Sequence, residues 1–199
     1  MSALARLRIP ERDFWIHLPA AFVLVVCSFV LACFCKGVLS GSDGVAAIWF
    51  AEAVTIAFLY RAPFTVWPLL LLSSILGNAL ASAVSDIPLL LSVLYAAAGG
   101  FESLLATCLL IVFCPGGQFF SDMDRWLRFI FFGALLPASV GAGLGAGIAE
   151  YFDRAPFFDV FLVWYISDAA GICVMLPLIH TFDRKYLAPF LSLRNGARL

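Results

Sequence analysis

Six long apolar runs follow one another along this chain, and they constrain its fold more than any other feature. The runs cover residues 17–36, 45–60, 64–84, 87–113, 127–149 and 158–180. A helix needs about 20 apolar residues to cross the roughly 30 Å hydrocarbon core of a bilayer. The runs lack the alternating apolar and polar residues of membrane β-strands. We therefore predict an all-α, polytopic transmembrane bundle of about six helices.

Composition supports this fold and excludes several classes of protein. Apolar residues make up 63% of the 199 residues and charged residues only 13%, whereas soluble domains have about 25% charged residues. The net charge of −1 gives no basic surface for nucleic acid. The six cysteines and two histidines lack zinc spacing, and no catalytic motif is readable. We expect no metal, no cofactor, no nucleic-acid partner and no enzyme activity in this segment.

The basic residues predict how the bundle is oriented. With a cytoplasmic N-terminus, ten of the twelve Lys and Arg residues fall on the cytoplasmic side, and only Lys36 and Arg154 fall in outer loops. Cytoplasmic loops are enriched in Lys and Arg, so both termini are expected in the cytoplasm. Residues 1–16 and 183–199 would be cytoplasmic segments, and residues 17–182 would form the membrane domain.

A run of glycines in the fifth span first suggests a dinucleotide-binding loop. Residues 141–146 fit the Gly-x-Gly-x-x-Gly/Ala pattern, but that pattern needs a preceding strand and free backbone N–H groups at a helix start. Inside an apolar helix those groups are already bonded. Glycines four residues apart instead let helix backbones approach closely. We therefore assign Gly141, Gly143, Gly145 and Gly147 to helix packing.

Three acidic residues lie near the middle of predicted spans: Glu52, Glu102 and Asp168. An ionised side chain at the bilayer centre costs about 2.5–3.5 kcal/mol on insertion scales, and no Lys or Arg lies at comparable depth to pair with these three. Asp168 shares a helix face with Trp164, and Asn78 lies in the outer half of the third span. The acids could line a pocket open to the outside. They could equally form hydrogen bonds between helices that fix the packing.

Short motifs occur in a fixed order through residues 14–182. They are Ile48-Trp49-Phe50, residues 57–61, Val66-Trp67-Pro68, Leu76-Gly77-Asn78, Glu102, residues 161–168, Gly171 and Leu176-Pro177-Leu178. In this order they resemble the membrane-associated sensor domain family, type one. Members are multi-helix modules of the bacterial inner membrane that precede GGDEF diguanylate cyclase, EAL or histidine kinase output domains.

The resemblance implies a sensory domain that regulates a cytoplasmic output domain, here incomplete at its C-terminal end. It implies as partners the lipid bilayer, a small periplasmic ligand or another membrane protein, and a homo-oligomer formed through the missing output domain. Family members often have Pro at the position of Ala51, and Glu52 is not a residue expected there. Glu52 is thus the weaker candidate for signal sensing. The stronger candidates are Trp49, Asn78, Glu102, Trp164 and Asp168.

Two other functions are compatible with the same residues. A small transporter or proton-coupled carrier would use the intramembrane acids as a relay. A membrane scaffold would bind another membrane protein, with the glycines of residues 141–147 as part of the contact.

Overall fold

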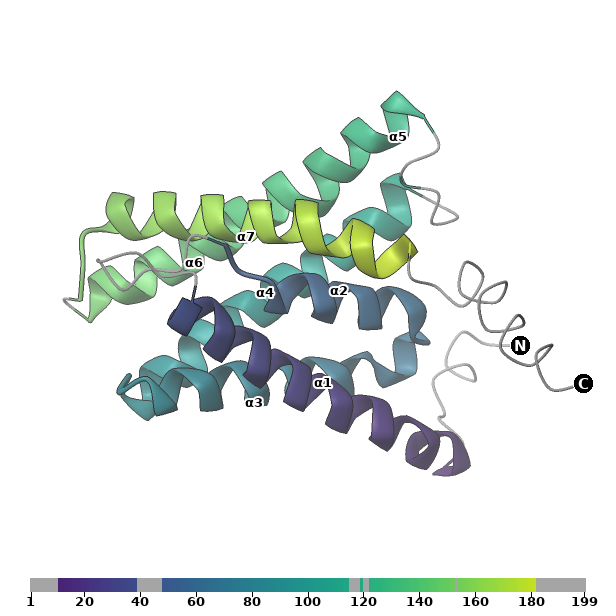
Figure 1. Ribbon diagram of the computed structural model, residues 1–199, viewed down its shortest axis with the longest axis horizontal. Helices are drawn as coiled ribbons and strands as arrows, with labels where there is room; N and C mark the ends of the chain where they lie inside the picture. Colours follow the sequence, from purple (N-terminus) through teal and green to yellow (C-terminus); the bar gives the residue numbers. More distant parts are fainter. Residues whose placement is uncertain (1–10, 39–47, 115–118, 120–121, 153, 182–199) are drawn as a thin grey trace, which may run out of the picture.

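The computed structural model describes residues 11–38, 48–114, 119, 122–152 and 154–181, and its regular structure there is entirely helical (Figure 1). The elements are α1 (Glu11–Val38), α2 (Ala51–Arg61), the short 3-10 helix η2 (Phe64–Val66), α3 (Trp67–Val84), α4 (Leu89–Phe113), α5 (Met123–Arg128), the π-helix η3 (Phe129–Leu135), α6 (Leu136–Tyr151) and α7 (Phe157–Thr181). The predicted all-α transmembrane bundle is confirmed.

Five helical stretches in the described part of the chain are long and apolar enough to cross a membrane. They are His17–Val38, Phe64–Val84, Leu89–Phe113, Met123–Tyr151 and Phe157–His180. Each overlaps a predicted span closely. The first helix begins at Glu11, six residues before the predicted start of the membrane domain. Residues 183–199 lie outside the described residues.

The second predicted span, residues 45–60, is wrong as a complete span. Helix α2 has only 11 residues, which at 1.5 Å per residue gives about 16 Å, half the thickness of the hydrocarbon core. Residues 48–50, before it, are not helical, and residues 45–47 lie outside the described residues. The apolar run of 16 residues is short for a span. In addition, the Trp49 N–H donates to the carbonyl oxygen of Ser167 at 3.1 Å, a tertiary contact that no sequence window contains.

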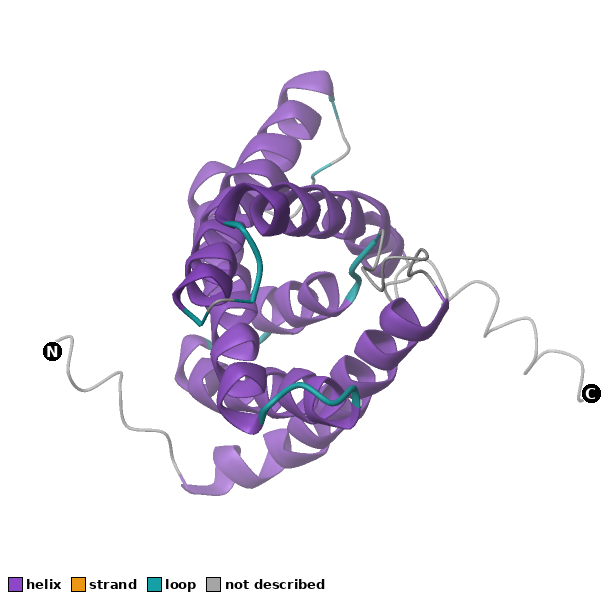
Figure 2. Ribbon diagram, turned by 90° about the vertical axis from the view of Figure 1, so that its left-hand side faces the viewer, coloured by secondary structure: helices purple, strands orange, loops and turns teal. Residues whose placement is uncertain are grey.

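The half-length helix α2 lies inside the bundle. The long helices pack in the spatial order α1, α3, α4, α6 and α7, and α2 contacts α1, α3, α4 and α7. The end-on view shows the helices arranged around the middle of the molecule (Figure 2). Eight of the 11 residues of α2 are buried, as expected for a helix that is apolar on all sides. Its alanines at 51, 53 and 57 have little or no exposed surface, so the neighbouring helices approach it closely.

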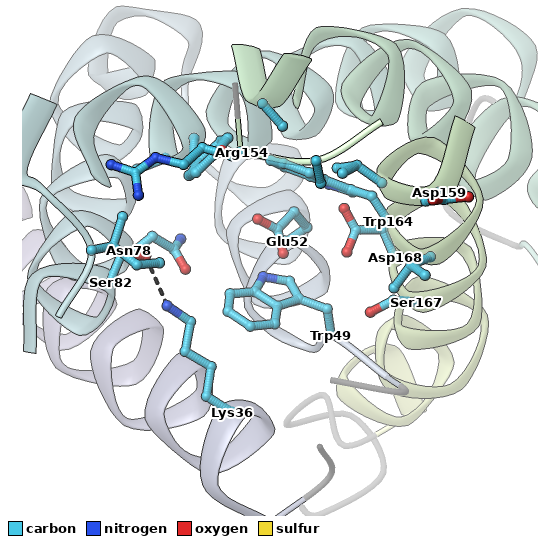
Figure 3. A pocket seen from close by; sticks show the side chains of 17 residues that line it. Lys36, Trp49, Glu52, Asn78, Ser82, Arg154, Asp159, Trp164, Ser167 and Asp168 are labelled. Atoms are coloured by element: carbon cyan, nitrogen blue, oxygen red, sulfur yellow. Dashed lines mark hydrogen bonds between the residues drawn. The ribbon is translucent and has the colours of Figure 1, made fainter. Parts of the chain in front are cut away.

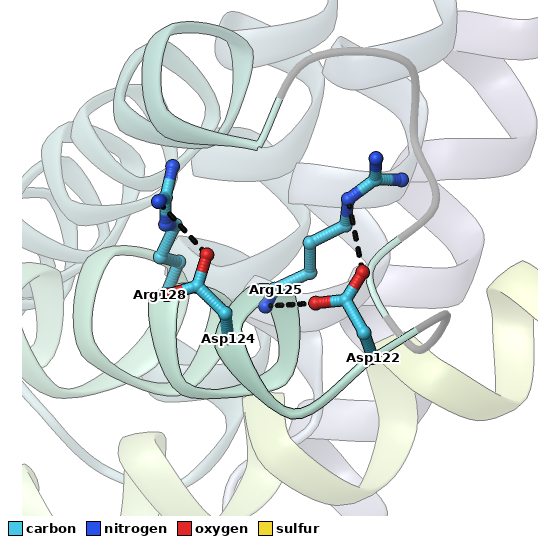
Figure 4. A network of polar contacts seen from close by, with 4 residues as sticks. All are labelled: Asp122, Asp124, Arg125 and Arg128. Carbon is cyan, nitrogen blue, oxygen red and sulfur yellow. Dashed lines mark hydrogen bonds and ion pairs between the residues drawn. The ribbon is translucent and has the colours of Figure 1, made fainter.

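The long helix before α7 changes its winding near its middle. The N–H of Leu136 bonds to the carbonyl of Phe131, five residues back, and Pro137 follows at once. Because Pro has no N–H and its ring collides with the preceding turn, a widened π turn accommodates it. The start of this helix is capped by Asp122, whose side chain accepts from the Arg125 N–H at 2.9 Å. Two exposed ion pairs, Arg125–Asp122 at 3.4 Å and Arg128–Asp124 at 2.8 Å, complete the cap (Figure 4).

The start of α1 and the end of α7 lie at the same end of the bundle, on the right in Figure 1. We call this the proximal end and the opposite one the distal end. Arg61 joins α2 to α7 at the proximal end, where its guanidinium donates to the Ile179 carbonyl at 3.2 Å. The structure thus places the start of α1 and the end of α7 on one side. That this side is the cytoplasm stays a prediction from the basic residues.

Candidate functional site

A pocket of about 480 Å³ opens at the distal end of the bundle. It exists because α2 fills only the proximal half of the interior. The first turn of α2 forms the floor, and α1, α3, α4, α6 and α7 supply the walls. Asp168, at the floor, is eleven residues into α7, which is about 17 Å from the start of that helix. The pocket therefore reaches from the distal surface to about the middle of the membrane.

The floor is held in place by a close backbone contact between the 48–50 segment and α7. Ser167 accepts from the Trp49 N–H, and one turn later Gly171 faces the Trp49 backbone. A Cβ at Gly171 would overlap the Trp49 carbonyl. Two motifs that are more than a hundred residues apart in the sequence thus form one contact, and this contact sets where α2 begins.

The three intramembrane acids gather beside this floor. Glu52 is 5% exposed, Asp168 2% and Glu102 0%. The Trp49 side chain interacts with the Glu52 carboxyl and the Trp164 side chain with the Asp168 carboxyl, so each acid has an indole beside it. Glu52 and Asp168 line the pocket and point into it (Figure 3). Glu102 is not part of the lining, and its carboxyl lies behind, next to that of Asp168.

These carboxyls are incompletely satisfied. Glu52 Oε2, Asp168 Oδ2 and both Glu102 oxygens are buried, and no N–H or hydroxyl group of the described residues donates to them. The carboxyls of Glu102 and Asp168 lie close enough for one to donate to the other when it carries a proton. A buried acceptor left unsatisfied costs about 1–3 kcal/mol, and more when it is charged. The three groups are also near enough to repel one another when ionised. A cation or a donor bound among them would relieve both costs.

Asn78 contributes a further unsatisfied acceptor from α3. Its amide NH₂ donates to the Ser74 carbonyl at 3.2 Å, and the Ser74 hydroxyl lies 2.6 Å from that of Thr55 on α2. The Asn78 side chain is therefore oriented by the α2–α3 contact. Its Oδ1 has no partner within the described part of the chain, and Figure 3 shows the amide directed into the pocket.

Two basic side chains line the mouth. The Lys36 ammonium donates to the Ser82 hydroxyl at 3.0 Å and lies 5.9 Å from the centre of the Trp49 ring. Arg154 comes from the turn between α6 and α7. Neither forms an ion pair of 4.0 Å or less with a described acid. In Figure 3 both lie on the side of the pocket away from Asp168, whereas Asp159, in the first turn of α7, lies on the Asp168 side. The mouth above the acidic floor therefore carries two basic residues and one acid.

Two of the four glycines in α6 contact the site. A Cβ at Gly145 would overlap the Trp164 ring, and one at Gly141 would overlap the Glu102 carboxyl. Trp164 also packs edge-on against Tyr95 of α4, with ring centres 5.7 Å apart. Gly143 and Gly147 face elsewhere, and a Cβ at either would meet nothing within 4 Å. Within this chain, Gly141 and Gly145 thus lie at contacts with other helices, and the packing role of all four glycines stays a prediction.

The structure brings four of the five stronger candidates, Trp49, Asn78, Trp164 and Asp168, together in one pocket and adds Glu52 to them. Sequence reasoning did not select Lys36, Ser82 or Arg154 as site residues. A signal existed for the two basic residues, since they are the two exceptions to the cytoplasmic bias of Lys and Arg.

Comparisons with known proteins give one family and one curated relative. The MASE1 family model matches residues 19–195. The curated relative is named "Probable diguanylate cyclase DgcE", from Escherichia coli (strain K12), and is 25% identical over 160 residues. That match covers 80% of this chain and 14% of the relative, so the chain corresponds to a small part of it. No solved structure matches.

Proposed function

The chain belongs to the MASE1 family of membrane sensory domains, and on that premise we propose that it regulates a cytoplasmic output domain from the bacterial inner membrane. A GGDEF diguanylate cyclase is the output that the comparisons favour, because the relative is named as such an enzyme. A histidine kinase is an alternative output that the resemblance to the family implies. This segment supplies the input, and an oligomer would form through the output domain.

The observation that carries this proposal is the distal pocket with its unsatisfied acids. Glu52 belongs to α2 and Asp168 to α7, and both helices run from the pocket floor to the proximal end. A ligand held between these two side chains would change how α2 packs on α7. The Arg61–Ile179 hydrogen bond links the same two helices at the proximal end, 3.2 Å from donor to acceptor. An output domain that follows α7 would receive the change directly.

The experiment uses a chimera in which this chain replaces the matching segment of the E. coli relative. Cellular cyclic di-GMP is measured with a fluorescent reporter for the wild-type chimera and for Asp168→Asn and Trp164→Phe. We expect both variants to change cyclic di-GMP by about fivefold or more, in the range of typical allosteric coupling, while membrane insertion stays normal. Glu150→Gln is the matched acidic control, because Glu150 is exposed and lies outside the pocket lining. Wild-type output in both pocket variants would rule out the pocket as the stimulus site.

A carrier is the second candidate, and the short helix α2 favours it. Transporters often place their substrate at the end of a discontinuous helix near the bilayer midplane, and α2 begins at about that depth beside Glu52. A carrier would move protons or a small solute into liposomes containing the purified chain. Absence of flux under a proton gradient would leave the sensory function.

A further inference from the structure

The floor of the pocket presents hydrogen-bond acceptors that no donor in the described part of the chain satisfies. Glu52 Oε2, Asp168 Oδ2 and Asn78 Oδ1 are buried and without a partner among the described residues. Their residues are 5%, 2% and 6% exposed, and all three side chains point toward the same space in Figure 3. A ligand group that suits them must bring several donors and, opposite two carboxyls, a positive charge. A primary ammonium brings three N–H donors and one charge.

The rim of the pocket carries two basic residues, Lys36 and Arg154, and one acid, Asp159. Lys36 and Arg154 both line it, and neither is paired with an acid in the part of the chain that the structure describes. Lys36 contacts a hydroxyl and an aromatic face instead. A lone organic cation would meet two like charges and only one opposite charge, that of Asp159, on entry. A ligand that also carries a carboxylate would meet favourable partners at both ends.

The remaining walls suit a small apolar or aromatic body. Trp49, Trp164 and Tyr95 line the space between floor and rim, together with Val160 and Val163. The volume of about 480 Å³ lies within the range of small-molecule sites, about 300–1,000 Å³. It is far larger than a bare metal ion or a proton relay requires.

We propose that this pocket binds a small zwitterion of the amino-acid type. The ammonium lies between Glu52, Asp168 and Asn78, the carboxylate faces Lys36 and Arg154, and the side chain packs against the indoles. The inference rests on the proposed function, because it names the ligand class of the same stimulus site. A simple amine and a divalent cation are the alternatives that the test separates.

The test is a calorimetric titration of the purified full chain in lipid nanodiscs. The probes are the common L-amino acids, each compared with the amine that lacks its carboxylate and the acid that lacks its ammonium, together with Mg²⁺. We expect at least one amino acid to bind at one site per chain. Both of its single-charge analogues should bind about tenfold or more weakly, since each loses a charge-assisted interaction. Binding of none of the amino acids, equal binding of the amine, or binding of Mg²⁺ alone would each overturn the proposal.

Variants locate the two ends of the ligand. Asp168→Asn should weaken binding of the amino acid and of its amine, whereas Lys36→Met should weaken binding of the amino acid and spare the amine. Asn78→Ala provides a second, neutral change at the floor and should also weaken both ligands. Glu150→Gln is the control and should bind as the wild type does. Equal effects of Lys36→Met on both ligands would contradict the placement of the carboxylate.

The outcomes separate this inference from the proposed function. If no amino acid binds but Asp168→Asn still alters cyclic di-GMP in the chimera, the ligand class is wrong and the sensory pocket stands. If an amino acid binds but the pocket variants leave cyclic di-GMP unchanged, binding is real and the sensory role of the pocket is refuted.

Discussion

Substitution of Gly171 by Ala tests the contact that sets the depth of the pocket. A Cβ at position 171 would fall on the Trp49 carbonyl, which is backbone and cannot rotate away. The 48–50 segment must then move off α7, and the 3.1 Å hydrogen bond from the Trp49 N–H to the Ser167 carbonyl is lost or stretched. Overpacking of this kind costs about 1–3 kcal/mol. Loss of the hydrogen bond adds about 0.5–1.5 kcal/mol.

The two costs together give a destabilisation of about 1.5–4.5 kcal/mol. For a chain of this length, 1 kcal/mol corresponds to roughly 2–4 °C in the midpoint of thermal unfolding, so Gly171→Ala should lower the midpoint by about 3–18 °C. In the assay, the purified chain in detergent is heated to a series of temperatures, and the fraction that stays folded is measured by size-exclusion chromatography. Gly147→Ala is the matched control, because a Cβ there meets nothing within 4 Å, and it should leave the midpoint unchanged or raise it. A midpoint for Gly171→Ala within 1 °C of the wild type would refute the reasoning.

Two further predictions follow. Thr55→Val removes the hydroxyl that lies 2.6 Å from Ser74 and should lower stability by about 1 kcal/mol; unchanged thermal unfolding would show that the α2–α3 hydroxyl pair contributes nothing. In a cysteine-free background, Arg154→Cys should react with a membrane-impermeant maleimide added outside intact cells, whereas Arg128→Cys should react only after lysis. The reverse pattern would show that the bundle has the opposite orientation to the one predicted from the basic residues.

Five of the six spans were predictable because a bilayer imposes a simple rule. Long apolar runs must become helices, and their limits in the structure follow those of the runs within a few residues. The prediction of a complete span at residues 45–60 failed because the rule considers hydrophobicity alone and ignores tertiary contacts. What stops α2 short is the bond from Trp49 to Ser167 and the small surface of Gly171, and both are tertiary.

The candidate site was predictable in part for a similar reason. Mid-membrane acids are costly wherever they lie, so Glu102 and Asp168 stand out from the sequence alone. Which of them reaches the pocket depends on helix rotation. The Glu102 side chain points toward Gly141 and away from the pocket lining. The Glu52 side chain points into the pocket, because α2 begins at Ala51 and Glu52 therefore lies in its first turn at the pocket floor. The charge pattern singled out Lys36 and Arg154 but could not assign them to one pocket, because they line it together only when α1 and the α6–α7 turn are placed in space.

The account's central claim is that α2 and α7 respond together to one ligand held between Glu52 and Asp168. A double-mutant cycle on cyclic di-GMP output of the chimera tests it most directly, using Glu52→Gln, Asp168→Asn and the combination. The account predicts that the double variant changes output little more than Asp168→Asn alone, because either change already disables the shared site. If the two effects instead add as independent free-energy changes, the two acids do not serve one site, and the claim is contradicted.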